Sequence, residues 1–304
     1  MKYFYPNRSV IPIIDLEISG KCNLHCPICW GTPRNMKQHY KFSEWLELLK
    51  VLQKSFGLKG IALTGGEPLL VPNIDNFIKE AKQGLGLCVN LLTNACYLDE
   101  HFNNIKPFLS TISIPLDGPT EEINKKIRGV GHFNIALNWI SRLNYNHLDL
   151  PLKVGTVVSA LNIKNVPDIG EVLLQCGVER RYPEQDVWKL YQATPFGAEQ
   201  NNPLWKLLRI SDSDFRNVAK KTKQKYKGKI NSVQLSTKEV GGYCIIIRPN
   251  GNVVANSNKD GKEHLLFNNI FTDTMGAMVA ISSYHDVKRG IDRLTSSYFG
   301  QGLN

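Results

Sequence analysis

Three cysteines near the start of the chain have a spacing that suits metal chemistry. Cys22, Cys26 and Cys29 form a C-x3-C-x2-C pattern, and no fourth cysteine or ligand-type histidine follows closely. A structural zinc site needs four ligands in a closed tetrahedron. Three thiolates on one short loop instead suit a [4Fe–4S] cluster in which one iron stays open to a small molecule. The cysteines alone also allow a zinc site with a distant fourth ligand, or buried free thiols.

A second motif, Gly65-Gly66-Glu67-Pro68, follows a short apolar segment at 60–63. Paired glycines let the backbone approach a ligand closely, because no Cβ atom intervenes. The Glu67 carboxylate can accept hydrogen bonds from an ammonium group. Taken by itself, the same run is also consistent with an ordinary surface turn.

In this order, the two motifs resemble those of the radical S-adenosylmethionine (SAM) superfamily. The resemblance implies that the cysteines hold one [4Fe–4S] cluster, whose open iron binds the amino and carboxylate groups of SAM. The metal ligands would be Cys22, Cys26 and Cys29, and Gly65, Gly66 and Glu67 would hold the methionine amino group. The cluster, reduced by a donor such as flavodoxin or ferredoxin, would cleave SAM to a 5′-deoxyadenosyl radical that abstracts hydrogen from the substrate. The first step requires no side-chain acid or base, so no catalytic side chain is assigned.

The elements that must position these motifs alternate between strand and helix patterns. Apolar runs predict strands at 10–18, 60–63, 87–93, 111–114, 152–158 and 187–191. Helical spacing predicts helices at 43–56, with Ser43 as N-cap, and at 73–83, 121–127, 133–143 and 166–175. Repeated strand–helix units imply a parallel sheet with helices outside. Because six units fall short of an eight-unit barrel of about 250 residues, we expect an α/β fold: a partial (β/α)6 TIM-type barrel at 1–200, like that of the superfamily, with a small α+β cap at 201–304.

Ligands of such barrels bind at the C-terminal ends of the strands, which nominates further polar residues. The candidates are Thr93 and Asn94 after the third strand, Ser113 and Asp117 at the fourth, and Arg128 beyond it. The run at 93–95 resembles a Thr-Asn-Gly stretch of the superfamily, with alanine in place of glycine. The resemblance implies that the Ser113 region contacts the ribose and amino group of SAM, and that Arg128 pairs with the SAM carboxylate. An ordinary polar loop residue is the alternative for each, and Trp30 either packs against adenine or fills the core.

The last third of the chain decides how many clusters are expected. Residues 243–254 predict a hairpin around a Pro-Asn-Gly turn. The hairpin resembles that of the SPASM or twitch extension, but Ala255 and Asn256 stand where a ligand cysteine is expected, and Cys244 is alone there. The remaining cysteines are Cys88, Cys96 and Cys176. We expect these to be buried free thiols and the chain to hold one cluster only.

Residues 150–255 resemble the viperin family, whose members carry a single cluster and convert nucleoside triphosphates to 3′-deoxy-3′,4′-didehydro forms. The resemblance rests on the stretches 152–158, 187–192 and 211–215 and on the hairpin, which come in the order of the family. It implies that Lys153 and Lys189 help to hold the substrate triphosphate. The sequence departs from the pattern at Val187, where viperins carry a phosphate-binding arginine, and at Lys59, which lies one position out of register.

Composition and charge limit the remaining possibilities. With 42% hydrophobic residues the chain of 304 residues can bury a sizeable core, and no apolar run predicts a membrane span or a signal peptide. Seven cysteines argue against a secreted disulfide framework, so a reducing cytoplasm is expected. The net charge of +10 favours anionic partners. Six lysines from Lys220 to Lys229 form either a solvated helix end or a site for a phosphate-rich ligand, a nucleic acid or an acidic leader peptide, although no nucleic-acid-binding motif accompanies them.

Three functions fit these observations. The first is a SAM-cleaving enzyme that acts on a nucleotide, a sugar or another anionic small molecule. The second is a peptide-modifying maturase that lacks auxiliary clusters. The third is a cluster-binding protein without turnover, against which the intact cysteine triplet and the Gly65-Gly66-Glu67 run argue. The sequence leaves the identity of the substrate open.

Overall fold

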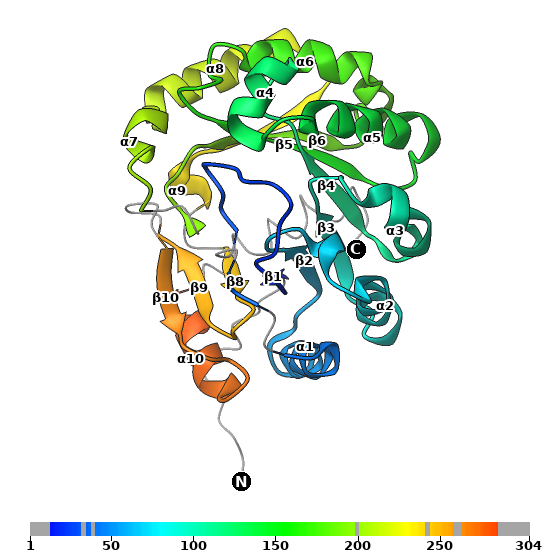
Figure 1. Ribbon diagram of the computed structural model, residues 1–304, viewed down its shortest axis with the longest axis vertical. Coiled ribbons are helices and arrows are strands. Elements are labelled where there is room, and N and C mark those ends of the chain that lie inside the picture. The colour runs from blue at the N-terminus through cyan, green and yellow to red at the C-terminus, as the bar shows by residue number, and fades with distance from the viewer. Residues whose placement is uncertain are drawn as a thin grey trace.

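In the described part of the chain, ten strands form one open, curved sheet (Figure 1). The computed structural model describes residues 13–31, 35–37, 40–197, 201–240, 244–257 and 263–284. The strands are β1 Ile13–Glu17, β2 Gly60–Thr64, β3 Cys88–Leu92, β4 Thr111–Pro115, β5 Leu152–Val158, β6 Asp186–Gln192, β7 Asn231–Leu235, β8 Ile245–Ile247, β9 Val253–Asn256 and β10 Glu263–Phe267. Their order is β10-β9-β8-β1-β2-β3-β4-β5-β6-β7, and β1 to β6 run parallel. The predicted α/β fold with a partial, unclosed TIM-type barrel is confirmed.

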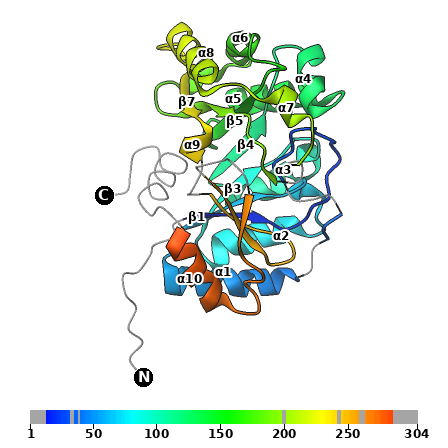
Figure 2. The same ribbon diagram turned by 90° about the vertical axis from the view of Figure 1, so that its left-hand side faces the viewer.

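Helices cover the outer face of this sheet (Figures 1 and 2). The described helices are α1 Phe42–Phe56, α2 Ile74–Lys79, α3 Leu98–Ile105, α4 Glu121–Arg128, α5 His132–Asn146, α6 Val166–Gln175, α7 Trp205–Leu208, α8 Asp212–Lys225, α9 Thr237–Val240 and α10 Thr274–Tyr284. The first six lie between successive parallel strands, as a strand–helix repeat requires. Among the helices just named, none combines the length and the apolar character needed to cross a bilayer.

Side chains alternate between the two faces of each strand, which separates the main core from the inside of the curve. Leu16 in β1, Leu91 in β3 and Val154 in β5 belong to the main apolar core. The buried polar side chains at alternate positions of the same strands are Asp15, Glu17, Asn90 and Lys153. The half-barrel is therefore apolar under its helices and polar on its inner face, and the C-terminal ends of its strands meet at one rim.

The predicted elements agree with the structure except at several ends. The strand at 152–158 and the helix at 166–175 are found with the predicted bounds. Ser43 is not the N-cap of α1, because Lys41 holds the cap position and its backbone N–H donates to Glu44 Oε2 at 2.7 Å. The helix predicted at 73–83 is α-helical only to Lys79, and a wider π-type turn continues it to Gly84.

No prediction covers α3, β7, β10 or α10. Helix α3 has only three buried apolar side chains, Leu98, Phe102 and Ile105, spaced one turn apart within an otherwise polar run. Strand β7 is only partly buried along most of its length. Short elements with so few apolar residues give a weak periodic signal, and their place in the fold comes from packing against neighbours.

Residues after 200 extend the sheet at both of its edges. Strand β7 lies parallel to β6 at one edge, and β8 lies parallel to β1 at the other. The predicted hairpin is confirmed for β8 and β9, which are antiparallel, while Tyr243 lies outside the described residues. Buried Arg248, directly after β8, donates to Glu17 Oε2 at 2.9 Å and pairs with Glu263 of β10. The division of the chain at residue 200 stays a prediction.

Candidate metal centre

The three-cysteine loop leaves β1 and is held against the end of β2 by backbone hydrogen bonds. The Gly66 N–H donates to the Ser19 carbonyl and the Glu67 N–H to the Lys21 carbonyl, each at 2.7 Å. This approach requires glycine, because a Cβ atom on residue 66 would lie 2.0 Å from the Lys21 carbonyl oxygen. Gly65 has a φ of +123°, a conformation that other residues rarely adopt. Gly65 and Gly66 therefore admit the backbone of the cysteine loop, and their predicted contact with SAM stays a prediction.

Glu67 lies buried behind this contact and joins the end of β2 to the end of β3. Its Oε1 accepts hydrogen bonds from the Thr93 hydroxyl at 2.7 Å and from the Leu69 N–H at 3.1 Å. Its Oε2 accepts one from the Asn94 N–H at 2.8 Å. The Asn94 side-chain amide donates in turn to Asn23 Oδ1, inside the cysteine loop, at 2.7 Å. Three residues predicted at this rim thus hold one another and the loop, and their contact with SAM stays a prediction.

The burial of Glu67 makes the stability of the fold depend on pH. Burial raises the pKa of Glu67 from 4.5 to about 7, although hydrogen bonds from Asn94 and Thr93 lower it. Between these values the folded state holds a proton that the unfolded state has lost, so stability falls as the pH rises. Relative to the uncharged Glu67→Gln variant, we expect the wild type to lose about 3 kcal/mol of unfolding free energy from pH 4 to pH 8. Urea unfolding of both proteins measures this, and a difference that is constant with pH would contradict it.

The three cysteine side chains lie close enough for their charges to act on one another. Cys26 is buried, and Cys22 and Cys29 are half-buried. Burial raises the pKa of Cys29 to about 11, and the neighbouring Cys26 and Cys22 add to the rise. Backbone N–H groups of Leu24 and Gly31 donate to the sulfurs of Cys22 and Cys29, both at 3.4 Å. A bound cation is what would hold these sulfurs as thiolates.

The donor set fits an iron–sulfur cluster, although the side chains are not yet turned toward a common centre. Within the described residues, no group of three or more His, Cys, Asp or Glu side chains is already arranged to bind a metal ion. Cys26 Sγ instead lies 3.9 Å from the Arg128 carbonyl oxygen. Three thiols on one loop, N–H groups directed at sulfur and limited solvent access are nevertheless the features that support such clusters. The assignment of Cys22, Cys26 and Cys29 as metal ligands stays a prediction.

The other four cysteines carry free thiols, and only one of them is buried. Cys176 is buried, whereas Cys88, Cys96 and Cys244 are half-buried, so the expectation of buried thiols is wrong for Cys88 and Cys96. Cys88 begins β3 and Cys96 follows the other end of that strand, so both lie at strand ends, where part of the side chain stays exposed. Cys244 donates to Asp15 on the inner face of the half-barrel.

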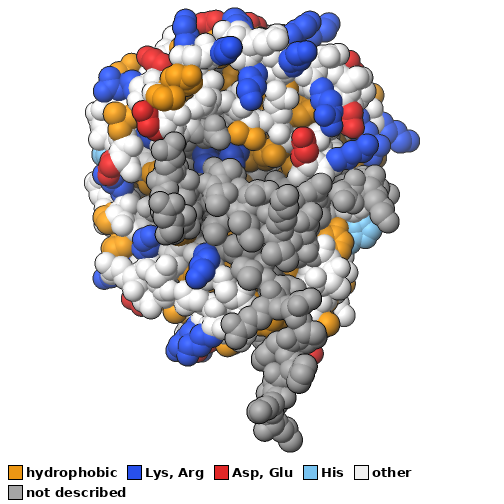
Figure 3. All heavy atoms as spheres, turned by 180° about the vertical axis from the view of Figure 1, so that it is seen from behind, with side chains coloured by type: hydrophobic (Ala, Val, Ile, Leu, Met, Phe, Trp, Pro, Cys, Tyr) orange, Lys and Arg blue, Asp and Glu red, His pale blue; other side chains and the backbone are white. Residues whose placement is uncertain are grey.

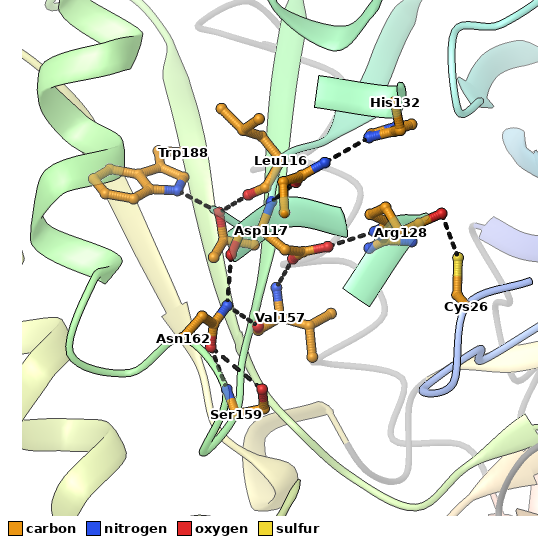
Figure 4. Close-up of polar contacts among 11 residues, drawn as sticks. Cys26, Leu116, Asp117, Arg128, His132, Val157, Ser159, Asn162 and Trp188 are labelled. Carbon is orange, nitrogen blue, oxygen red and sulfur yellow. Dashed lines mark hydrogen bonds and ion pairs between the residues drawn. The ribbon is translucent and has the colours of Figure 1, made fainter. Parts of the chain in front are cut away.

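Arg128, at the end of α4, lies beside the cysteine loop and pairs with an anion of the protein itself (Figure 4). Its Nε donates to Oδ2 of Asp117, which is fully buried. Partial burial works against the charge of the guanidinium, but Asp117 outweighs it and raises the pKa of Arg128. Among the described residues, no group accepts a hydrogen bond from the two terminal guanidinium nitrogens. These nitrogens suit the predicted SAM carboxylate, and that contact stays a prediction.

Asp117 is fixed by polar contacts from three directions. Its Oδ1 accepts a hydrogen bond from the Val157 N–H, at the end of β5, at 2.6 Å. Its backbone carbonyl accepts one from Asn162 Nδ2 at 2.9 Å, and its backbone N–H donates to Asn124 Oδ1 at 3.0 Å. Figure 4 shows these contacts converging on Asp117 from different elements. The carboxylate is therefore held before any ligand arrives.

Two further hydrogen bonds tie β4, β5 and β6 together just below this point. The Thr156 hydroxyl donates to the Leu116 carbonyl at 2.6 Å, and Trp188 Nε1 donates to Thr156 Oγ1 at 2.9 Å (Figure 4). Both side chains are fully buried. Trp188 thus has a structural role, because its hydrogen bond to Thr156 joins β6 to β5, and Lys189 is the next residue in β6.

His132 supports the same rim as a neutral residue. Burial lowers the pKa of His132 to about 3, and the nearby Arg128 lowers it further. Because Asn124 Oδ1 accepts from Asp117, Asn124 Nδ2 is the atom that faces His132 Nδ1, at 3.1 Å. Neutral His132 must then accept at Nδ1 and carry its proton on Nε2.

The remaining candidates lie inside the half-barrel, with one exception. Ser113 is next to Lys153 in the strand register, its Oγ lies 3.5 Å from Asn90 Oδ1, and Lys189 lies one strand further on, opposite Gly155. The exception is Lys59, which is exposed and precedes β2 at the end far from Gly65. Trp30 packs edge-on against Tyr191 and Phe196, at ring-centroid distances of 6.1 and 5.6 Å. The predicted contacts of Ser113 with SAM and of both lysines with phosphate stay predictions.

The lysines from 220 to 229 lie on the end of α8 and the turn after it. Lys225 is paired with Glu171 of α6 at 3.1 Å. Helix α8 belongs to the outer layer, away from the cysteine loop (Figures 1 and 2). Figure 3 shows Lys and Arg side chains gathered over this upper part of the molecule, with some Asp and Glu among them. This position separates the basic run from the candidate metal centre.

Sequence reasoning did not single out Asn23, Asn124, His132 or Asn162. Each is an amide or imidazole side chain whose partner lies on another element. The signal available for Asn162 was its place just after the end of a strand of the half-barrel. The alternation of Asp15 and Glu17 with apolar residues in β1 was the signal for the polar inner face.

Residues 16–163 match the family model described as the radical SAM superfamily. An S-adenosylmethionine-dependent nucleotide dehydratase from Lacinutrix mariniflava is 28% identical over 262 residues, which are 82% of this chain and 51% of that protein. A probable GTP 3′,8-cyclase from Methanocaldococcus jannaschii is 30% identical over 164 residues, which are 53% of this chain and 55% of that protein. The chain therefore spans about half the length of these two relatives.

A solved structure supports the same fold. Streptococcus suis SuiB bound to S-adenosylmethionine superimposes with a TM-score of 0.67 at 13% identity, covering 94% of this chain and 68% of SuiB. At this identity the likeness is one of fold alone, and it includes residues beyond the family match.

Proposed function

Since residues 16–163 make this chain a member of the radical SAM superfamily, we propose that it cleaves SAM reductively and abstracts a hydrogen atom from an anionic, nucleotide-like small molecule. The superfamily consists of SAM-dependent enzymes that use a [4Fe–4S] cluster. The observation that carries the proposal is the docking of the three-cysteine loop on Gly65 and Gly66 at the rim of the half-barrel. We expect a reducing cytoplasm to house this chemistry, with a flavodoxin or ferredoxin as electron donor.

When bound, the cluster and SAM supply a 5′-deoxyadenosyl radical. The part of the chain is to hold and orient both groups. The three cysteines would ligate iron, and the hydrogen bonds of Gly66 and Glu67 would keep their loop at the rim. Arg128 would orient the SAM carboxylate. No side chain is assigned as an acid or base, because hydrogen-atom abstraction needs position and exclusion of competing reactions instead.

Two features support a nucleotide as the substrate. The relatives named above are a nucleotide dehydratase and a GTP cyclase, although each aligns over about half of its length. Lys153 and Lys189 lie on neighbouring strands at positions that share the inner face of the half-barrel. Two ammonium groups there suit a phosphate chain that extends down from a sugar at the rim.

Replacing Lys153 or Lys189 with methionine is expected to weaken nucleotide binding and leave basal SAM cleavage unchanged. A lost charge-assisted hydrogen bond corresponds to about a 10- to 100-fold increase in KM for a triphosphate. The matched control is Lys50→Met, on the exposed side of α1, where the ammonium pairs with Glu47. KM for the triphosphate and for the unphosphorylated nucleoside should be compared. Equal changes for the two ligands would reject a phosphate-binding role.

The function itself is tested with anaerobically reconstituted protein and a set of deuterated nucleoside triphosphates. Transfer of label into 5′-deoxyadenosine is expected with one of them. Absence of 5′-deoxyadenosine under strong reductant would reject SAM cleavage. Cleavage that is stimulated by a peptide and by none of the nucleotides would reject the substrate class and favour the maturase alternative.

A further inference from the structure

We infer that Asp117 is a positioning residue, which holds the Arg128 guanidinium by one nitrogen so that the other two are presented to a carboxylate-bearing ligand beside the cysteine loop. This inference rests on the proposed function, because SAM is the carboxylate-bearing ligand in question. Asp117 itself would touch neither SAM nor the cluster. Its effect on the ligand would pass through Arg128 alone.

The two oxygens of Asp117 have separate partners. Oδ1 accepts from the Val157 N–H at 2.6 Å, and Oδ2 accepts from Arg128 Nε (Figure 4). Contact through Nε leaves the two terminal nitrogens, which together can form a parallel, two-bond contact with a carboxylate. A protein carboxylate that took both terminal nitrogens would block that contact.

Charge and burial explain why the pair persists without a ligand. The side chain of Asp117 is fully buried, whereas that of Arg128 is 21% exposed. A buried carboxylate without a cation is costly, and in the part of the chain that the structure describes Arg128 is the basic residue that pairs with it. Arg128 is therefore held at Nε, and its two terminal nitrogens are left to bind a ligand.

The backbone of Arg128 lies against the cysteine loop, where a ligand of the cluster would lie. The Arg128 carbonyl oxygen is 3.9 Å from Cys26 Sγ. Arg128 also acts electrostatically on Cys29, whose pKa its positive charge lowers against the larger effect of burial. The guanidinium is thus paired with Asp117 and lies near enough to the cysteines for its charge to act on them.

A fixed arginine binds with less loss of side-chain freedom than a mobile one. Arg128 would otherwise have to order a long side chain on binding. The contact with Asp117 already orders the Arg128 side chain before a ligand binds. Asp117 is itself held by its contacts with Val157, Asn162 and Asn124. The resulting gain in affinity should therefore be found for ligands that carry a carboxylate and not for ligands that lack one.

The test is anaerobic calorimetry on oxidised, cluster-loaded protein, which binds ligands without turnover. The ligands are SAM and decarboxylated SAM, which keeps the amine and the adenosyl group. Asp117→Asn retains a hydrogen-bond acceptor for the Val157 N–H and loses the charge. We expect it to weaken SAM binding about tenfold and to leave the affinity for decarboxylated SAM within about twofold. Equal weakening of both ligands, or of neither, would overturn the inference.

A double substitution separates positioning from a general structural role. If Asp117 acts through Arg128, Asp117→Asn should have no further effect on SAM affinity in the Arg128→Ala background. Losses that add would show that Asp117 acts by another route. Asp99→Asn, which breaks the surface pair with Arg142, is the matched control and should change neither affinity.

Two further results must be considered: Asp117→Asn that does not fold, and wild-type protein that does not bind SAM. If Asp117→Asn does not fold, Arg128→Lys replaces it, since lysine keeps the charge but not the second terminal nitrogen; wild-type SAM affinity in this variant would overturn the inference. If the wild-type holoenzyme itself does not bind SAM, the proposed function fails as a whole. Normal SAM binding that is indifferent to Asp117 removes only the positioning role.

Discussion

Replacing Cys26 with alanine is expected to remove iron from the protein and to abolish 5′-deoxyadenosine formation. Cys26 is the buried member of the triplet and the one whose sulfur lies next to Arg128. With two thiolates in place of three, the loop cannot hold a cubane that already has one open iron. Iron should fall from about four per chain to below one, and SAM cleavage by at least about a thousandfold.

Iron and sulfide analysis after anaerobic reconstitution, with chromatography of 5′-deoxyadenosine, measures both effects. The matched control is Cys176→Ala. Cys176 is a buried free cysteine at the end of α6, an element that does not carry the cysteine loop. This variant should retain iron and activity. A Cys26→Ala protein with full iron content would show that the three cysteines are not the ligands, and about eight irons in the wild type would show a second cluster.

Replacing Gly66 with alanine is expected to release the cysteine loop from β2. The new Cβ atom would meet the Lys21 carbonyl at 2.0 Å and the Gly20 carbonyl at 2.6 Å, which are backbone atoms and cannot rotate away. The hydrogen bonds from Gly66 to Ser19 and from Glu67 to Lys21 would be strained or lost. Overpacking and the loss of two buried hydrogen bonds should together cost about 3–5 kcal/mol of stability.

The loss should be concentrated at the metal centre. We expect reconstituted Gly66→Ala to hold a small fraction of the wild-type iron and its urea midpoint to fall. Gly155→Ala is the matched control, because a Cβ atom there meets only a Tyr191 ring carbon at 3.6 Å, an ordinary contact. Wild-type iron content in Gly66→Ala would mean that the loop does not depend on its docking to β2.

The features that could be predicted from the sequence are those that depend on short, contiguous runs of residues. The cysteine triplet and the Gly65-Gly66-Glu67 run are local, and so is the apolar run of β5, which is found with its predicted bounds. Repetition of such units then fixes a parallel half-barrel, because parallel strands require helical connections. From that fold it follows that the ends of β2, β3 and β4 meet at one rim.

The parts that escaped prediction depend on pairs distant in sequence. Nothing in the neighbourhood of Arg128 indicates that Asp117 takes its Nε, or that the amide of Asn162 reaches back 45 positions to the Asp117 carbonyl. The predicted contact of the paired glycines with a ligand stays a prediction, whereas their close approach to the backbone of the cysteine loop was not predicted. Such contacts depend on tertiary packing, which cannot be inferred from a single sequence.

The place of β1 between β2 and β8 has a consequence for how the protein is made. The strand that carries the cysteine loop leaves the ribosome before Arg248, which pairs with Glu17 of that strand and follows it 231 positions later. At typical translation speeds this interval lasts roughly 10–50 seconds. A nascent chain can therefore assemble the first strands and their loop, yet β1 lacks its β8 neighbour throughout this interval. The support that β8 and Arg248 give to β1 is therefore added well after the cysteine loop has been made.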